Sequence, residues 1–277
     1  MVNKCSFTAL LLIVLFLAAC SPNNVTIDSS LKAYFDSSKV DGCFGLYDNG
    51  SGQFTIYNLN RYKDSAYLPA STFKIVNSLV GIEIGRIVNE RMVIKWDGVV
   101  RIFPGGDTAK AWNKDLTMEE AFKASAVPYY QEVARRIGRD TMQHWLDSLK
   151  YGNKKIGSHI DSFWLDNTLK ITPDEQLGLV KKLYFGQLGF QKRTQDIVKK
   201  VMLQESNANY RLSYKTGWGF KENGNSVGWT VGWIEENHHP YFFVLNIEGP
   251  HIMDMPTIRK NILTSILKKE DFFEGRK

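Results

Sequence analysis

The order of structural signals along the sequence predicts an α+β fold in which both ends of the chain contribute to one antiparallel sheet. Strand patterns occur near the start, at Cys43–Tyr47 and Phe54–Tyr57, and return from Tyr210 onward. Between them, helix caps and the helical spacing of apolar residues dominate. We therefore expect an α/β sandwich, in which helices flank a sheet made from the two ends and the middle of the chain forms a mainly helical subdomain.

The first 19 residues have the pattern of a secretory signal peptide. Lys4 precedes an apolar run over residues 9–17, which is too short for a permanent membrane span. The sequence Leu17-Ala18-Ala19-Cys20 is similar to a bacterial lipobox, which predicts cleavage before Cys20 and lipidation of its sulfur. The alternative is an ordinary signal peptide with an incidental cysteine.

Cysteine usage argues against a disulfide-stabilised fold. If Cys5 is removed with the signal peptide and Cys20 is lipidated, Cys43 is the only thiol left for an intrachain bond. Stability must then come from packing, for which the remaining length is sufficient. The expected division of the chain is a signal peptide at 1–19, a polar tether at 20–30 and one folded domain at 31–277.

The charge distribution indicates a small-molecule ligand rather than a nucleic acid. The formal net charge is +6, and basic pairs such as Lys154-Lys155 alternate with acidic residues along the chain. A mild positive balance favours an anionic small molecule. A nucleic-acid groove would need a basic run with interleaved aromatic residues, and the sequence contains none.

The first predicted element of the folded domain is a β-hairpin, in which Asp48-Asn49-Gly50-Ser51-Gly52 supplies the turn between the two strands. A helix follows, because Phe73, Val76, Leu79 and Val80 recur at helical spacing.

The middle of the chain begins with a loop-rich passage at 96–114, which bends at Pro104-Gly105-Gly106-Asp107. Three helix starts follow, at the expected capping boxes Thr117–Glu120 and Asp140–Gln143 and at Thr172–Glu175, where proline occupies the first helical position.

Between the first two of these starts, Pro128 should end one helix before the next begins at Tyr129. Ser125 therefore lies at a predicted turn, free to face a cleft, although local sequence alone favours a helix cap for it.

The last third of the chain returns to strands. They are expected at Tyr210–Lys215, Trp229–Ile234 and Tyr241–Ile247, with a hairpin turn at 237–240. A closing helix is predicted over Pro256–Lys269, where Ile258, Ile262, Ile266 and Leu267 form an apolar face.

The chemistry centres on Ser71 and Lys74, which stand one helical turn apart and therefore share a face. A serine hydroxyl needs a base to take its proton, and a lysine acts as a base only where burial lowers its pKa. The Ser-x-x-Lys pattern is short and occurs again at Ser29/Lys32 and Ser265/Lys268. Taken alone, it is weak evidence for catalysis.

A second element strengthens the case. Lys215-Thr216-Gly217 follows a predicted strand, so the lysine can point into a cleft while the glycine leaves room for a ligand. The order Ser71/Lys74, Ser125, Lys215-Thr216-Gly217 is that of the penicilloyl serine transferases.

Along nearly its whole mature length the chain resembles the class D serine β-lactamases, or oxacillinases. The resemblance implies the penicillin-binding/β-lactamase fold for 31–277. It also implies hydrolysis of the β-lactam amide bond of penicillins, oxacillin-type substrates included, and hence antibiotic resistance. The motifs that carry it, in order, are Ser71-Thr72-Phe73-Lys74, Ser125-Ala126-Val127, Tyr151-Gly152-Asn153, Phe163-Trp164-Leu165, Lys215-Thr216-Gly217-Trp218 and Arg259. The loop from Gly105 to Trp112 looks longer than in many relatives, which leaves the substrate range open.

The resemblance implies that Ser71 attacks the lactam carbonyl and that Lys74, carboxylated by carbon dioxide, is the general base for both acylation and deacylation. A buried carbamate needs donors, and the indole N–H of Trp164 would be one. Val127 would help to keep the carbamate dry. Judged from local sequence alone, Trp164 is more readily a core aromatic.

The remaining roles concern the substrate. Ser125 is expected to relay a proton to the leaving lactam nitrogen. Lys215 and Arg259 would hold the substrate carboxylate together with the rest of the Lys215–Trp218 segment, although a solvated helix position is the simpler interpretation of Arg259. The backbone N–H groups of Ser71 and Trp218 should form the oxyanion hole. Tyr151 and Asn153 are interpreted as supporting structure.

Other functional classes have less support in the sequence. Metal hydrolysis lacks support, because none of the five histidines forms a His-x-His or His-Glu-x-x-His pair. Nucleotide chemistry lacks support as well, because the sequence contains no nucleotide-binding glycine loop. A β-lactam receptor that stays acylated is the main alternative, and a D,D-peptidase is a further one.

We expect no metal and no cofactor beyond carbon dioxide or bicarbonate. We further expect a periplasmic protein, lipid-anchored to the outer membrane of a Gram-negative bacterium, acting as a monomer or homodimer.

Overall fold

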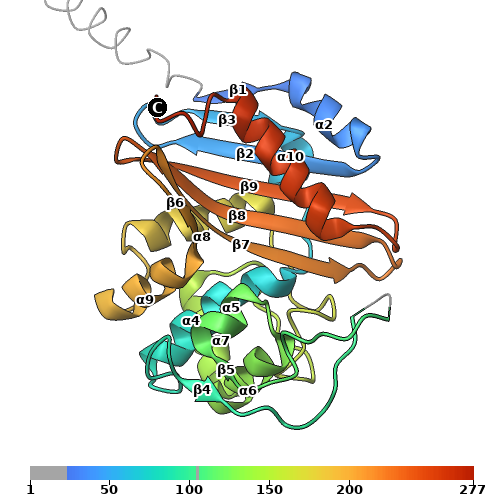
Figure 1. Ribbon diagram of the computed structural model, residues 1–277, viewed down its shortest axis with the longest axis vertical. Helices are drawn as coiled ribbons and strands as arrows, with labels where there is room; N and C mark the ends of the chain where they lie inside the picture. The colour runs from blue at the N-terminus through green and yellow to red at the C-terminus, as the bar shows by residue number, and fades with distance from the viewer. Residues whose placement is uncertain (1–23, 104–105) are drawn as a thin grey trace, which may run out of the picture.

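The computed structural model describes residues 24–103 and 106–277 (Figure 1). It contains one seven-stranded sheet in the order β1-β3-β2-β9-β8-β7-β6. The strands of this sheet are β1 (Val25–Ile27), β2 (Asp41–Asp48), β3 (Phe54–Tyr57), β6 (Leu203–Ser206), β7 (Tyr210–Phe220), β8 (Ser226–Glu236) and β9 (His239–Gly249).

The expected sheet that unites the two ends of the chain is confirmed. The predicted hairpin is β2 and β3, which pair antiparallel, and β2 pairs along its whole length with β9 near the C-terminus. The strands of the C-terminal half are longer than predicted. β7, β8 and β9 have 11 residues each and pair with one another along their whole length, and β8 and β9 are buried almost throughout instead of alternating.

The N-terminal edge differs from the expected tether. Val25–Ile27 forms β1 and pairs parallel with β3, and Leu31 is fully buried against the sheet. Two β-branched apolar residues in three are sufficient to extend the edge of an existing sheet. The expected signal peptide, Cys20 and the first part of the tether lie outside the described residues.

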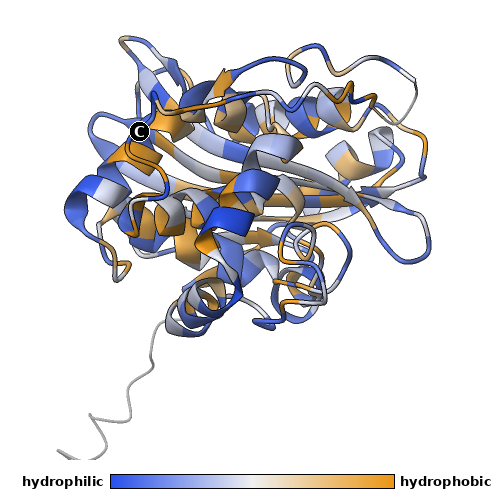
Figure 2. Ribbon diagram, turned by 90° about the horizontal axis from the view of Figure 1, so that it is seen from below, coloured by the Kyte–Doolittle hydropathy of each residue, from blue (hydrophilic) through white to orange (hydrophobic). Residues whose placement is uncertain are grey.

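Helices cover both faces of the sheet (Figure 1). On one face, α2 (Lys32–Ser37) and α10 (Met255–Lys269) bury their apolar sides in a core that includes Phe35, Phe243 and Ile266. The opposite face packs against η2 (Ala70–Phe73), α8 (Pro173–Tyr184) and α9 (Lys192–Met202). Hydrophobic and hydrophilic colours occur within single helices in Figure 2, as expected for helices with one buried side.

The middle of the chain forms the predicted helical subdomain, which lies below the sheet in Figure 1. Its elements, with the short helix α3 that precedes them at the sheet, are α3 (Leu59–Asp64), α4 (Lys74–Glu83), β4 (Val93–Ile94), β5 (Leu116–Thr117), α5 (Met118–Lys123), α6 (Val127–Ile137) and α7 (Arg139–Leu149).

Two of the three predicted helix starts are confirmed in detail. Thr117 and Thr172 both form complete capping boxes, with Glu120 and Glu175 respectively. The expected box at Asp140 is wrong. Helix α7 already begins at Arg139, directly after Gly138 at φ +80°, so Asp140 lies inside the first turn and caps nothing.

Pro128 falls in the first turn of α6 rather than at the end of α5, which stops at Lys123. This position needs no N–H, so proline is tolerated there. Within the described residues, no helix combines the length and apolar character needed to cross a bilayer.

Candidate active site

Ser71 and Lys74 meet where η2 continues into α4. The ammonium nitrogen of Lys74 donates to Ser71 Oγ over 2.7 Å, and the lysine side chain is fully buried. Removal of the ammonium group from water lowers the pKa of Lys74 to about 7, from a usual value of 10.5. A large fraction of Lys74 is therefore neutral near neutral pH, as a general base requires.

The backbone before the nucleophile is held in an unusual conformation. Ala70 has φ +47°, a left-handed value that disfavours residues with a Cβ. Its N–H donates to the carbonyl of Trp164 over 3.0 Å, and the Pro69 carbonyl accepts from both the N–H and the hydroxyl of Thr72. These bonds maintain the strained turn that presents Ser71.

Ser125 lies in the turn between α5 and α6, also at positive φ (+53°), and the helix cap is its neighbour Ala126. Its hydroxyl accepts a short hydrogen bond from the ammonium group of Lys215 on β7. Lys215 is almost fully buried, and burial, followed by the charges of Lys74 and Arg259, lowers its pKa well below 10.5. The site thus contains a second serine–lysine pair, built from two distant segments.

Two aromatic rings that the sequence analysis did not single out accompany these lysines. Lys74 Nζ lies 5.5 Å from the ring centroid of Tyr130, and Lys215 Nζ lies 5.3 Å from that of Phe122. Tyr130 is itself fixed by a 2.9 Å hydrogen bond to Ser78. In the sequence, the only feature that could have drawn attention to Tyr130 is the pair of tyrosines, Tyr129-Tyr130, directly after Pro128.

Trp164 is fully buried beside the nucleophile. Its ring stacks on Phe73 at 5.5 Å between centroids and meets the edge of Phe163. Unlike an ordinary core tryptophan, its indole N–H has no hydrogen-bond partner within the described residues. A buried donor without an acceptor is costly, so this N–H is available to an acceptor added at the site.

The Lys215-Thr216-Gly217 segment runs along β7 close to η2. A side chain at Gly217 would place its Cβ 2.9 Å from the carbonyl oxygen of Pro69, so glycine is what permits this approach. Within the described residues, β6 pairs with β7 only at 211–213. The rest of β7 therefore presents an edge without a strand partner toward the site.

Arg259 reaches β7 from α10 on the other side of the sheet. It is 9% exposed, which rules out the solvated position that local sequence favoured, and its Nη1 donates to the Gly217 carbonyl over 2.6 Å. Burial lowers the pKa of Arg259 to about 10. The side chain of Thr216 lines a cavity of about 170 Å³ beside α10 together with Arg259. Trp218 packs against the α10 core and donates to Ser226.

The loop that carries Trp164 is supported by the Tyr151–Asn153 segment. Tyr151 is buried edge-on against Phe73, and Gly152 has φ +49° with the Lys170 carbonyl against its open side. Asn153 donates to the carbonyl of Thr168 and accepts from the N–H of Lys170. These contacts agree with a supporting role.

The loop at 96–114 reaches the site through Trp112, a further residue that the sequence analysis did not select. Trp112 Nε1 donates to the carbonyl of Ala124 over 2.8 Å, next to Ser125. Val127, the expected hydrophobic shield, is half-buried at the first residue of α6.

Three buried basic side chains, Lys74, Lys215 and Arg259, dominate the electrostatics of this region. Within the described residues, none of them forms an ion pair with a carboxylate. Uncompensated buried charge is unfavourable, so the site favours anions. No group of three His, Cys, Asp or Glu residues in the described parts of the chain is placed to hold a metal ion.

Comparisons with known proteins agree with this arrangement. A family model described as the penicillin binding protein transpeptidase domain matches residues 33–268. The chain is 40% identical to β-lactamase OXA-48 of Klebsiella pneumoniae over 248 residues, which is 88% of each chain.

Solved structures agree as well. The class D β-lactamase YbXI from Nostoc is 36% identical with a TM-score of 0.81, covering 88% of this chain and 99% of its own. The C-terminal domain of the Bacillus licheniformis BlaR penicillin-receptor is 30% identical with a TM-score of 0.83, covering 92% and 100%. From the matched domain, the identity and the shared structure, we conclude that the chain belongs to the class D β-lactamases.

Proposed function

We propose that this protein hydrolyses the β-lactam amide bond of penicillins, including oxacillin-type penicillins, through an acyl-enzyme on Ser71. The observation that carries the proposal is the 2.7 Å contact between Ser71 Oγ and a fully buried Lys74 whose pKa is lowered to about 7. A nucleophile and its base within hydrogen-bond reach are the first requirement of this chemistry.

Acylation follows from the geometry of the two serine–lysine pairs. Ser71 Oγ attacks the lactam carbonyl while its proton is transferred to the general base at Lys74. Ser125, hydrogen-bonded to Lys215, then delivers a proton to the lactam nitrogen as the C–N bond breaks. The backbone N–H groups of Ser71 and Trp218 stabilise the oxyanion, where loss of one donor typically costs about 3 kcal/mol in the barrier.

Carboxylation of Lys74 fits the residues present. A neutral amine is needed to react with carbon dioxide, and burial supplies it. The buried indole N–H of Trp164, which has no acceptor among the residues that the structure describes, is suited to hold the new anion, and Val127 would limit the access of water to it. When bound to Lys74, the carboxyl group supplies a general base for both acylation and deacylation. It also introduces negative charge beside Lys215.

Substrate recognition rests on the remaining cations. Penicillins carry a carboxylate, and Lys215 and Arg259 are buried without an ionic partner in the described residues. Arg259 lies within reach of β7 through its bond to Gly217, so an anion at this edge would meet both side chains.

The test is steady-state hydrolysis of a chromogenic cephalosporin and of oxacillin by the chain without residues 1–20, with and without bicarbonate and in the presence of a chelator. We expect sustained turnover that survives chelation and rises with bicarbonate. Ser71→Ala should abolish both turnover and covalent labelling by penicillins. Turnover retained by this variant would overturn the serine mechanism.

A second candidate is a β-lactam receptor that is acylated without turnover. The similarity to the BlaR receptor domain favours it, because that domain superposes with a TM-score of 0.83. In the same assay, one stoichiometric burst without further product would establish the receptor function instead.

A further inference from the structure

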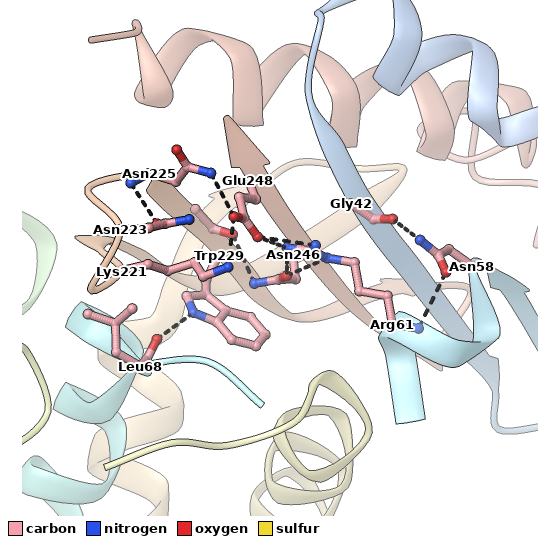
Figure 3. Close-up of polar contacts among 11 residues, drawn as sticks. Gly42, Asn58, Arg61, Leu68, Lys221, Asn223, Asn225, Trp229, Asn246 and Glu248 are labelled. Atoms are coloured by element: carbon pink, nitrogen blue, oxygen red, sulfur yellow. Dashed lines mark hydrogen bonds and ion pairs between the residues drawn. The ribbon is translucent and has the colours of Figure 1, made fainter. Parts of the chain in front are cut away.

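A buried tryptophan on β8 holds the segment that leads to the nucleophile. Trp229 Nε1 donates to the carbonyl of Leu68 over 2.9 Å, and Trp229 is fully buried (Figure 3). Leu68 lies three residues before Ser71 in the chain. Because Pro69 follows directly, its peptide nitrogen has no N–H with which to anchor this segment. The indole therefore provides an attachment that the backbone at Pro69 does not.

The same indole also packs against β7. Trp229 is the cross-strand partner of Gly217, and a Cβ added to Gly217 would lie 3.2 Å from Cδ1 of Trp229 and 2.9 Å from the Pro69 carbonyl. Trp229 is thus in contact with the strand that carries Lys215 and with the turn that carries Ser71.

A polar network fixes Trp229 from behind. Tyr67 meets the indole edge-on at 6.2 Å, and the guanidinium of Arg61 lies 4.4 Å above the Tyr67 ring. Arg61 in turn donates through Nε and Nη2 to Asn246 Oδ1 at 3.0 and 2.8 Å (Figure 3). Asn246 is the cross-strand partner of Trp229 on β9, so the chain of contacts closes on itself.

Glu248 supplies a negative charge to this network, next to the positive charges of Arg61 and Lys221. Glu248 accepts from Lys221 at 2.8 Å and from Arg61 at 3.4 Å (Figure 3). Arg61 and Glu248 are both nearly buried, with 11% and 12% of their side chains exposed. Buried groups with satisfied hydrogen bonds rigidify their surroundings, so the network restricts Tyr67 and Trp229 to one arrangement.

We propose that Trp229 is a positioning residue for acylation. It acts by fixing the Leu68 carbonyl, and through it the placement of Ser71 relative to Lys215. The inference rests on the proposed function, because it concerns the attack by Ser71. Trp229 is not assigned a contact with the substrate. Its effect belongs to the rate of attack rather than to binding, since displacement of a reacting group by about 1 Å can cost about 100-fold in rate.

The experiment compares Trp229→Phe with wild type in single-turnover labelling by a fluorescent penicillin. Phenylalanine keeps an apolar ring and removes the N–H. The labelling gives three quantities: the acylation rate constant at saturation, the half-saturating concentration and the labelled fraction. We expect the rate constant to fall about 10- to 100-fold. The other two quantities should stay within about twofold of wild type.

The matched control is Trp233→Phe. Trp233 lies four residues further along β8, is 2% exposed, and packs on Tyr184 away from the nucleophile. Its replacement should leave all three quantities near wild type. If Trp229→Phe lowers only the labelled fraction, or acylates at the wild-type rate, Trp229 is an ordinary core residue and the inference is overturned.

If Trp229→Phe does not fold, Arg61→Gln provides the test, because it leaves the indole in place and removes the guanidinium from Tyr67 and Asn246. A several-fold lower acylation rate supports the inference, and an unchanged rate overturns it. Labelling measures acylation alone. A wild-type protein that is labelled but releases no product therefore contradicts hydrolysis while leaving the Trp229 comparison intact, whereas an unlabelled wild type overturns both.

Discussion

Among single residues, Lys74 shows a direct consequence of burial, because desolvation favours its neutral amine over its ammonium form. Its pKa is 10.5 in an unfolded chain and about 7 in the folded protein, so between these values the unfolded chain binds more protons. The free energy of unfolding must then rise with pH across this window. Below a pH of about 7 both states are protonated, and the buried charge destabilises the folded protein in full.

We therefore expect wild type, in buffer depleted of carbon dioxide, to gain up to about 5 kcal/mol from Lys74 between about pH 7 and 10.5, at about 1.4 kcal/mol per pKa unit. Urea unfolding of wild type and Lys74→Met at a series of pH values measures this contribution. The variant should lack the part of the rise that Lys74 contributes, although Lys215 still contributes its own, and it should be more stable at the acidic end. Parallel curves for the two proteins would show that Lys74 is not desolvated.

Trp164 supports a second prediction at this scale. Trp164→Phe keeps the stacking on Phe73 and removes the indole N–H, for which the described part of the chain offers no acceptor. A hydrogen bond to a charged group contributes about 1.5–3 kcal/mol, so the variant should need about 10- to 100-fold more bicarbonate for half-maximal activity. Bicarbonate titration of steady-state turnover measures this. Deacylation should slow more than acylation, and a wild-type bicarbonate requirement would assign Trp164 to the core alone.

Among the secondary-structure elements, the predicted helix starts differ in outcome: the capping boxes at Thr117 and Thr172 are present, and the one predicted at Asp140 is not. Thr117 and Thr172 are themselves extended and form complete capping boxes. Asp140 has the same local spacing to Gln143, but Gly138 already ends α6 and starts α7, so no extended residue is left at Asp140 to act as a cap. Which of two adjacent helix starts is used depends on how the neighbouring helix ends.

This difference can be measured. Thr172→Ala removes the hydroxyl that accepts from the Glu175 N–H and should lower the free energy of unfolding by about 1 kcal/mol. Asp140→Ala serves as the control and should change it by less than about 0.5 kcal/mol. Urea unfolding at neutral pH compares the two. An equal loss in both variants would mean that Asp140 caps α7 in solution.

At the scale of the whole molecule, the active site depends on pairing between the two ends of the chain. β2 pairs with β9, and this sheet carries β7 against the turn before Ser71. Lys215 and Ser125 are 90 residues apart in sequence yet share a hydrogen bond. The site therefore forms only when the helical subdomain and the sheet are packed together.

Membrane attachment of the protein is predicted from the sequence alone, because Cys20 lies outside the residues that the structure describes. We propose lipidation of Cys20 and a periplasmic location at the outer membrane. In a Gram-negative host, the full-length protein should fractionate with membranes, and Cys20→Ala should move it to the soluble fraction at unchanged specific activity. A wild-type protein found in the soluble fraction would contradict lipidation.

Most of the longer elements and all of the motifs could be predicted from the amino-acid sequence, because these depend on local properties. Apolar spacing predicted the helix after Ser71, turn residues predicted the hairpin, and the order of Ser71, Ser125 and Lys215 indicated the family. Helices α2, α3 and α9 and strands β1, β4, β5 and β6 were not predicted. β1 and β6 are short, and edge strands gain most of their stability from the sheet they join.

The environment of each side chain depends on the tertiary structure and could not be predicted from local sequence. The burial that lowers the pKa of Lys74, the unpartnered N–H of Trp164 and the burial of Arg259 all arise from packing between distant segments. The same holds for the bond from Trp229 to Leu68, which joins residues 161 positions apart. Periodicity reports which side of an element is buried, whereas desolvation and hydrogen bonding depend on what lies opposite, and that is fixed only when the elements assemble.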